Sequence, residues 1–291
     1  MDDALECPDE SLRIAVQRIS KLPTIPDVAQ KIMGMINDDI TTIDKLEDVI
    51  TRDPIISAKI LSYANSAFFG MDQPTTVVSK AISRIGTNNV KNIALGISLM
   101  TMFDSPSMTK ILDIERLFNH SLAVGMIAEF IMRRVYPNSG EEVFIYGILH
   151  DIGLIALNRY FPEQFSKVII ENKAGTPFID AEIQIMGFTH AHIGMWLIDK
   201  WNLPNGISYT LLNHHTPALA NTEREKTAVI HLADYIISER FFPITKSPGY
   251  RLDPVALDIM GLSPKGLEEL TAKVVAHMIS KGFDMCNPKI R

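Results

Sequence analysis

The chain has 291 residues, of which 46% are hydrophobic and 21% charged, a composition typical of a globular protein with one large domain or two modest ones. Its formal net charge of -6 argues against direct binding of nucleic acid, because proteins that do this usually carry a basic stripe. The acidic start lacks the pattern of a secretory signal, no apolar run is long enough to cross a membrane, and the two cysteines form neither a metal motif nor a disulfide framework. We therefore expect a cytoplasmic protein without a membrane partner.

Helical periodicity begins close to the N-terminus. Apolar residues recur at helical spacing over residues 26–37, and the proline at the start of this stretch suits a first helical turn. Thr42 is the expected N-cap of the next helix. Asp53, which is followed by a proline, is the expected N-cap of a third helix, and Gly70 is its expected end.

The same periodicity continues over residues 78–85, where Gly86 is expected to stop the helix. Asn88 or Asn89 is expected to cap a further helix that runs toward Phe103. No catalytic set of residues occurs up to this point.

A polar, proline-containing segment at residues 104–107 is the best internal break in the chain. All eight histidines follow it, between His120 and His277. This asymmetry predicts two parts, a packing or recognition half over residues 1–105 and a half that carries chemistry over residues 106–291. Helical spacing also dominates the second half, so we predict an all-α fold. The helices expected there cover 117–131, 143–154, a stretch from 189, 204–215, 222–241 and 264–281.

Histidine and aspartate residues fall at apolar positions of these helices. His120 lies on an apolar stripe, His150 and Asp151 end an apolar run, and Asp234 lies in the apolar sequence AVIHLADYI. A buried aspartate is costly without a cation or hydrogen-bond donors beside it. Imidazole and carboxylate groups that arrive from several helices are ligands for a divalent metal, with Fe, Mn, Mg and Zn as the candidates. Further candidate ligands are His190, His214 and His215, each of which is a weaker candidate when taken alone.

Each of these residues also has a plainer interpretation. A single histidine on an apolar stripe is more often a hydrogen-bonded core residue than a metal ligand. We expect supporting or surface roles for His192 and His231 and a structural role for His277. Trp196 and Trp201 are expected to anchor the core.

The order His, His-Asp, Asp resembles the HD superfamily of metal-dependent phosphohydrolases. The four residues that this resemblance implies as metal ligands are His120, His150, Asp151 and Asp234. The chain is more closely similar to one branch, the HDOD (HD-related output) domain, over residues 12–235. The phrases that carry this similarity are KLPTIPDVAQKI, DPIISAKILSYANSAFFG, VVSKAISRIGTNNVKNIAL, HSLAVGMIAEF, GILHDIGLIAL and FTHAHIGMWLIDKWNLP followed by HH.

The resemblance implies a helical N-terminal subdomain packed on an HD-domain-like helical bundle. It also implies a bacterial signal-transduction module with protein partners and with a metal, nucleotide or phosphoester ligand in the HD-type cleft. HDOD domains are similar to HD-GYP phosphodiesterases, and in this comparison His190, His214 and His215 match positions that complete a second metal site.

Two departures from HD-GYP relatives bear on activity. Leu154 stands where they carry a lysine, and the Gly-Tyr-Pro signature is missing after His215. A basic residue near the metal would help to neutralise phosphate charge. The leading interpretation is therefore a regulatory module. The alternative is an active phosphohydrolase, in which Asp151 with His190 or His214 takes part in catalysis, and a third is a metal-free scaffold.

Overall fold

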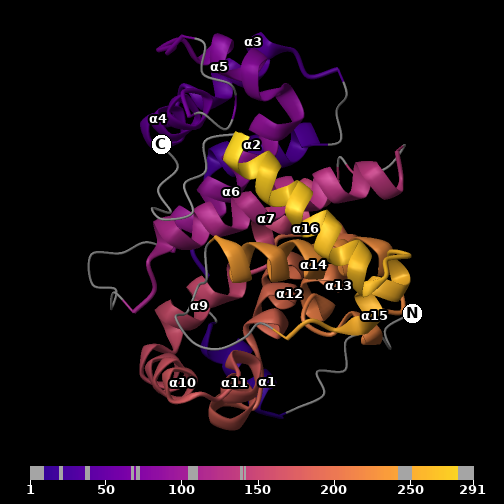
Figure 1. The fold of residues 1–291 in the computed structure, drawn as a ribbon. Helices are drawn as coiled ribbons and strands as arrows, with labels where there is room; N and C mark the ends of the chain where they lie inside the picture. The colour runs from indigo at the N-terminus through magenta and orange to yellow at the C-terminus, as the bar shows by residue number, and fades with distance from the viewer. Residues whose placement is uncertain are drawn as a thin grey trace.

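A computed structural model describes residues 10–19, 22–36, 40–66, 69, 73–103, 111–137, 140, 142–241 and 251–280. All the regular elements in these residues are helices, which confirms the all-α prediction (Figure 1). No helix in the described part is long and apolar enough to cross a membrane.

The helices before residue 105 form the upper part of the molecule in Figure 1, except for the first one. They are α1 (Glu10–Arg18), α2 (Asp27–Ile36), α3 (Ile43–Ile50), α4 (Pro54–Ala64), α5 (Val78–Ile85) and α6 (Thr87–Thr101).

The helices of the second half follow from a long central helix, α7. They are α7 (Ile114–Val135), α8 (Val143–Leu149), α9 (Ile152–Tyr160), α10 (Pro162–Ala174), α11 (Phe178–Met186), α12 (His190–Lys200), α13 (Asn205–Asn213), the short 3-10 helix η2 (Pro217–Leu219), α14 (Arg224–Arg240), α15 (Pro254–Ile259) and α16 (Pro264–Ser280).

Two of the predicted helix starts are confirmed by side-chain caps. The Thr42 hydroxyl accepts a hydrogen bond from the backbone N–H of Lys45 at 3.4 Å. The Asp53 carboxylate accepts from the backbone N–H groups of Ile55 and Ile56 at 2.8 and 3.1 Å. These bonds satisfy first-turn donors that no helical carbonyl can reach.

The predicted end of the third helix is wrong. Helix α4 ends at Ala64, and Gly70 lies outside the described residues. The side chain of Asn65 donates to the carbonyl of Thr75 at 2.8 Å and accepts from the N–H of Thr75 at 2.7 Å. This pair of bonds to a segment ten residues away replaces the continuation of the helix.

The predicted caps of α6 are also wrong. Gly86 is itself the residue before the helix, with φ of 94°, and α6 begins at Thr87. Asn88 and Asn89 therefore lie in the first turn. A positive φ is accessible to glycine without steric cost, so Gly86 ends α5 and starts α6 in one step.

One hydrophobic cluster contains buried side chains from both halves of the chain. Helix α6 packs against α7 and α8, while α1 packs against α12, far from the rest of the N-terminal helices (Figure 1). The predicted break at residues 104–107 lies outside the described residues, and the division at residue 105 stays a prediction.

Candidate metal centre

Six buried histidine and aspartate residues meet where helices of the second half converge. Each is at most 2% exposed. Four of the six stand at helix ends. The six are His120 within α7, His150 at the C-cap of α8, Asp151 before α9, His190 at the start of α12, His214 at the C-cap of α13, and Asp234 within α14.

The chain breaks at His150 and Asp151, although the sequence pattern predicts one helix over residues 143–154. Asp151 has φ of -105° and ψ of 14°, which separates α8 from α9. The prediction failed because apolar residues continue at helical spacing on both sides of the break. The break places the two polar side chains between the helices instead of on a continuous apolar stripe.

Two glycines allow the helices to approach closely enough to bring these side chains together. A Cβ atom on Gly147 would lie 2.3 Å from the Cα of Gly125, where α8 crosses α7. A Cβ atom on Gly153 would lie 2.0 Å from the carbonyl oxygen of His190, where α9 meets α12. No real Cβ contact is that short, so both crossings require a residue without a side chain.

Asp151 is the centre of the cluster. Its Oδ2 lies 3.1 Å from His150 Nε2. Its Oδ1 lies 3.1 Å from His190 Nε2 and 3.6 Å from His214 Nε2. A single carboxylate therefore faces three imidazole nitrogens.

Asp234 holds the opposite side of the cluster. Its Oδ1 lies 3.0 Å from His120 Nε2 and accepts a hydrogen bond from the Ser238 hydroxyl at 3.0 Å. Its Oδ2 lies 3.9 Å from His150 Nε2. The two aspartates thus enclose the imidazole groups between them.

The potential ligand atoms form overlapping sets, within each of which all atoms lie less than 4.8 Å apart. One set is His120, His150 and Asp151, another is His150, His214 and Asp234, and a third is Asp151, His190, His214 and His215. Only His215 is half-buried. The structure therefore brings together all seven residues that the sequence marked as candidate ligands.

Backbone carbonyls fix the orientation of two imidazole rings. His150 Nδ1 donates to the carbonyl of Gly147 at 2.7 Å, and His214 Nδ1 donates to that of Leu211 at 2.6 Å. Because a carbonyl can only accept, the Nδ1 atoms carry the protons. In a neutral ring the Nε2 atom then presents a lone pair to the carboxylates. A protonated ring instead donates from Nε2, so in either form the carboxylates face a positive charge, which is a ring proton or a metal ion bound through the Nε2 lone pairs.

Sequence reasoning missed Glu182, which is 0% exposed. Its carboxylate accepts from His190 Nδ1 at 2.9 and 3.0 Å and from the backbone N–H of His190 at 3.2 Å. This contact turns His190 Nε2 toward Asp151, as outer carboxylates do for metal-bound histidines. The local sequence FIDAEIQIM resembles an ordinary amphipathic helix, so the sequence pattern does not predict that this glutamate is buried.

The pKa values agree with a site that attracts positive charge. Burial alone would lower the pKa of His150, but the Asp151 carboxylate outweighs it and raises this pKa to about 9. Burial is likewise outweighed at His190, whose pKa the Glu182 carboxylate raises to about 10. Burial would raise the pKa of Asp151, yet His150 holds it well below its ordinary value.

His214 and His215 behave differently. Burial lowers the pKa of both rings, and for His215 the neighbouring His214 lowers it further. Both are therefore neutral at pH 7, which is the form of imidazole that binds a metal.

The HDOD family model matches residues 22–217. The chain belongs to the HDOD family. An uncharacterized protein from Treponema pallidum (strain Nichols) is 24% identical to this HDOD chain over 202 residues. The match covers 68% of this chain but only 38% of that protein, so this chain spans well under half of the relative.

Solved structures share the fold of this HDOD chain. An HDOD domain protein of unknown function from Geobacter sulfurreducens has a TM-score of 0.78 and 22% identity, with 97% of this chain and 99% of that chain covered. A candidate signal-transduction protein from Marinobacter aquaeolei VT8 has a TM-score of 0.73 and 22% identity, with 95% of this chain and 65% of that chain covered.

The remaining histidines of the HDOD chain have supporting positions. His231 Nδ1 donates to the carbonyl of His214 at 2.7 Å, and its Nε2 accepts from the N–H of Asp253 at 2.8 Å. His192 forms a capping box with Thr189 at the start of α12. His277 of α16 stacks on the ring of Phe130 in α7, with centroids 4.7 Å apart.

The two tryptophans and Leu154 are packing residues. Trp201 is 4% exposed, with its ring centroid 6.1 Å from that of Phe103, and Trp196 packs partly buried against the same core. Leu154 is 1% exposed, so no basic side chain reaches the cluster from this position.

Proposed function

We propose that this protein is a regulatory HDOD module whose buried histidine and aspartate cluster binds a divalent metal ion. The observation that carries the proposal is the convergence of imidazole Nε2 atoms on the carboxylate of Asp151, with Nδ1 of each ring directed to an acceptor. In this arrangement His150 Nε2 is buried and lies 3.1 Å from Asp151 Oδ2. A metal ion between these groups would satisfy all of them.

The ligand chemistry favours particular metals. His120, His150, Asp151 and Asp234 offer two nitrogen and two carboxylate donors, and His190, His214 and His215 add nitrogen donors around Asp151. Imidazole-rich sets suit Fe, Mn or Zn better than Mg, which prefers oxygen ligands and bound water.

The helices around the cluster favour a cation for a further reason. His150 and His214 stand at the C-caps of α8 and α13. Helix C-termini carry partial negative charge, which adds to the field of the two aspartates.

A regulatory role is favoured by what the site lacks. Leu154 is a core residue at the position where related phosphodiesterases carry a lysine, so phosphate charge gains no basic partner from it. The structural neighbour from Marinobacter aquaeolei VT8 is described as a candidate signal-transduction protein. In this role the state of the metal or of a bound ligand would be passed to a protein partner.

A second candidate function is metal-dependent phosphoester hydrolysis. It is favoured by the overlapping sets of ligand atoms around Asp151, which offer enough nitrogen and carboxylate donors to hold more than one metal ion. A bound metal supplies a water of lowered pKa as a nucleophile. Asp151 would hold the metal, and His190 or His214 would assist proton transfer.

Elemental analysis tests the metal site. The wild-type protein is purified without chelator or histidine tag beside Asp151→Ala, and circular dichroism confirms that both are folded. We expect stoichiometric Fe, Mn or Zn in the wild type and its loss in the variant. Absence of metal from both folded proteins would refute the proposal.

Turnover separates the two functions. The wild type is assayed with bis-p-nitrophenyl phosphate and added Mn, Fe or Mg, again beside Asp151→Ala. Turnover that the variant loses favours the hydrolase. Retained metal without turnover favours the regulatory module.

A further inference from the structure

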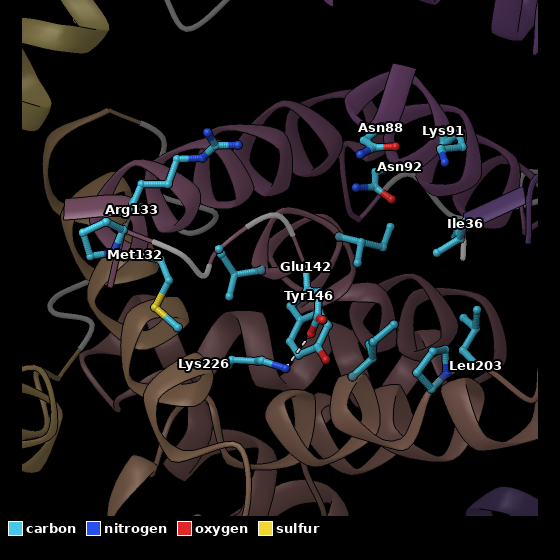
Figure 2. Close-up of a pocket in the computed structure, with 16 residues that line it drawn as sticks. Ile36, Asn88, Lys91, Asn92, Met132, Arg133, Glu142, Tyr146, Leu203 and Lys226 are labelled. Carbon is cyan, nitrogen blue, oxygen red and sulfur yellow. Dashed lines mark hydrogen bonds and ion pairs between the residues drawn. The ribbon is translucent and has the colours of Figure 1, made fainter. Parts of the chain in front are cut away.

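A cavity lies between α6, the end of α7, α8, α13 and α14 (Figure 2). Its volume is about 960 Å³, which is at the upper end of the range for small-molecule sites. None of the histidine and aspartate residues of the candidate metal centre lines it. It therefore belongs to neither the metal proposal nor the hydrolase alternative.

Basic side chains outnumber acidic ones on the wall of this cavity. Lys91, Arg133 and Lys226 line it, and Glu142 is the acidic residue among the described lining. Lys91 is 2% exposed and donates to the carbonyl of Met35 at 2.9 Å, so its position is fixed.

The acidic partners of the other two cations lie mostly outside the cavity. Arg133 contacts Glu129 at 2.7 Å, and Lys226 contacts Glu223 at 2.9 Å, but neither glutamate lines the cavity. Glu142, which Lys226 also contacts, has a 70% exposed side chain. An anion that enters could therefore take the place of Glu142 beside Lys226 at little desolvation cost.

Three helices of eight or more residues begin at the cavity. Asn88 of α6, Ile207 of α13 and Lys226 of α14 line it from the first turns of their helices. None of these three helices has a side-chain hydrogen bond at its N-cap. Helix N-termini carry partial positive charge, and here that charge adds to the field of the three basic side chains.

The rest of the wall suits an organic body. The ring of Tyr146 and the side chains of Leu203 and Ile207 are buried apolar surface. Asn88 and Asn92 lie one helical turn apart on α6, across the cavity from Tyr146 (Figure 2). Their amides can both donate and accept, as the polar edge of a base or a sugar requires.

We propose that this cavity binds a phosphorylated small molecule of nucleotide size, with its phosphate beside Lys226 and Arg133 and its planar part between Tyr146 and the two asparagines. The site is separate from the metal centre, although α13 joins the two: this helix begins at the cavity and ends at His214.

Direct binding measurements test this. AMP, GMP, CMP and UMP are titrated into the full chain by calorimetry, with adenosine as an uncharged probe and inorganic phosphate as a probe without an organic body. The variants are Lys226→Met and Arg133→Met, which keep most of each stem. Lys200→Met removes an exposed cation elsewhere and is the matched control. Asp151→Ala reports on the metal centre.

We expect at least one nucleotide to bind, with adenosine and inorganic phosphate each about tenfold weaker or more. Each cavity variant should weaken nucleotide binding by about tenfold, while Lys200→Met and Asp151→Ala leave it unchanged. If Lys226→Met does not fold, nucleotide binding by Arg133→Met still tests the proposal, because Arg133 is exposed and its replacement should not disturb the fold. The proposal is overturned if no nucleotide binds at millimolar concentration, if phosphate binds as tightly as the nucleotide, if the cavity variants bind normally, or if Asp151→Ala alone abolishes binding.

Discussion

Replacement of Gly153 by alanine tests whether the crossing of α9 and α12 builds the candidate metal centre. The new Cβ would lie 2.0 Å from the carbonyl oxygen of His190, and ordinary contact begins at 3.4 Å, so the two backbones must separate by about 1.4 Å. Asp151 and His190 stand on either side of this crossing, with Oδ1 and Nε2 3.1 Å apart. The separation therefore acts directly on the distance between two proposed ligands.

Gly153→Ala should lower both the stability of the protein and its affinity for metal. Overpacking of a buried crossing costs about 2–3 kcal/mol, which lowers Tm by roughly 3–5 °C for a chain of this size. A displacement of about 1 Å in a preorganised site costs on the order of 100-fold, and we expect metal affinity to fall by that factor. Differential scanning calorimetry measures the first, and titration against a competing chelator measures the second.

Gly34 offers a matched control, because a Cβ there meets nothing within 4 Å and the residue lies inside α2. Gly34→Ala should raise stability by about 0.5–1 kcal/mol and leave metal affinity unchanged. A Gly153→Ala protein with the Tm and metal affinity of the wild type would show that the crossing does not control the cluster.

Four further outcomes are expected. Glu182→Gln should lower metal affinity by about 10- to 100-fold with little loss of fold, because a neutral amide orients His190 less firmly; an unchanged chelator titration would contradict this. The pKa values of about 9 for His150 and about 10 for His190 mean that protons occupy these rings at neutral pH, so apparent Mn²⁺ affinity should rise as pH rises from about 6 to about 9, and a flat calorimetric profile would count against competition at these nitrogens. EDTA should lower the Tm of the wild type and leave that of folded Asp151→Ala unchanged; equal shifts in both would place the metal elsewhere. Asn65→Ala should cost about 1–3 kcal/mol in urea unfolding, because it removes both hydrogen bonds to one backbone segment, and a change below 0.5 kcal/mol would show that water replaces them.

Where helices form follows largely from local sequence. The apolar spacing, the cap at Thr42 and the Asp53-Pro54 start are signals carried within a few residues, and the structure has helices where they predict them. The inward positions of α16 also agree with its spacing, since Leu267, Leu270, Val274 and Met278 are all buried. The placement of helix ends was less predictable where a distant partner competes, as at Asn65.

The residues that meet in the candidate metal centre were also visible in the sequence, because histidines and aspartates at apolar positions stand out from a core pattern. That pattern contains no distances. The convergence on Asp151 depends on the break between α8 and α9 and on crossings that Gly147 and Gly153 permit. Glu182 looks like a surface residue in its own helix, and only the packing of α11 against the start of α12 shows that it is fully buried against His190. The cavity at the beginnings of α6, α13 and α14 likewise joins residues far apart in the chain. Local propensity thus determined the elements and the chemical groups, whereas the distances between those groups were decided by backbone crossings that form only when the whole core packs.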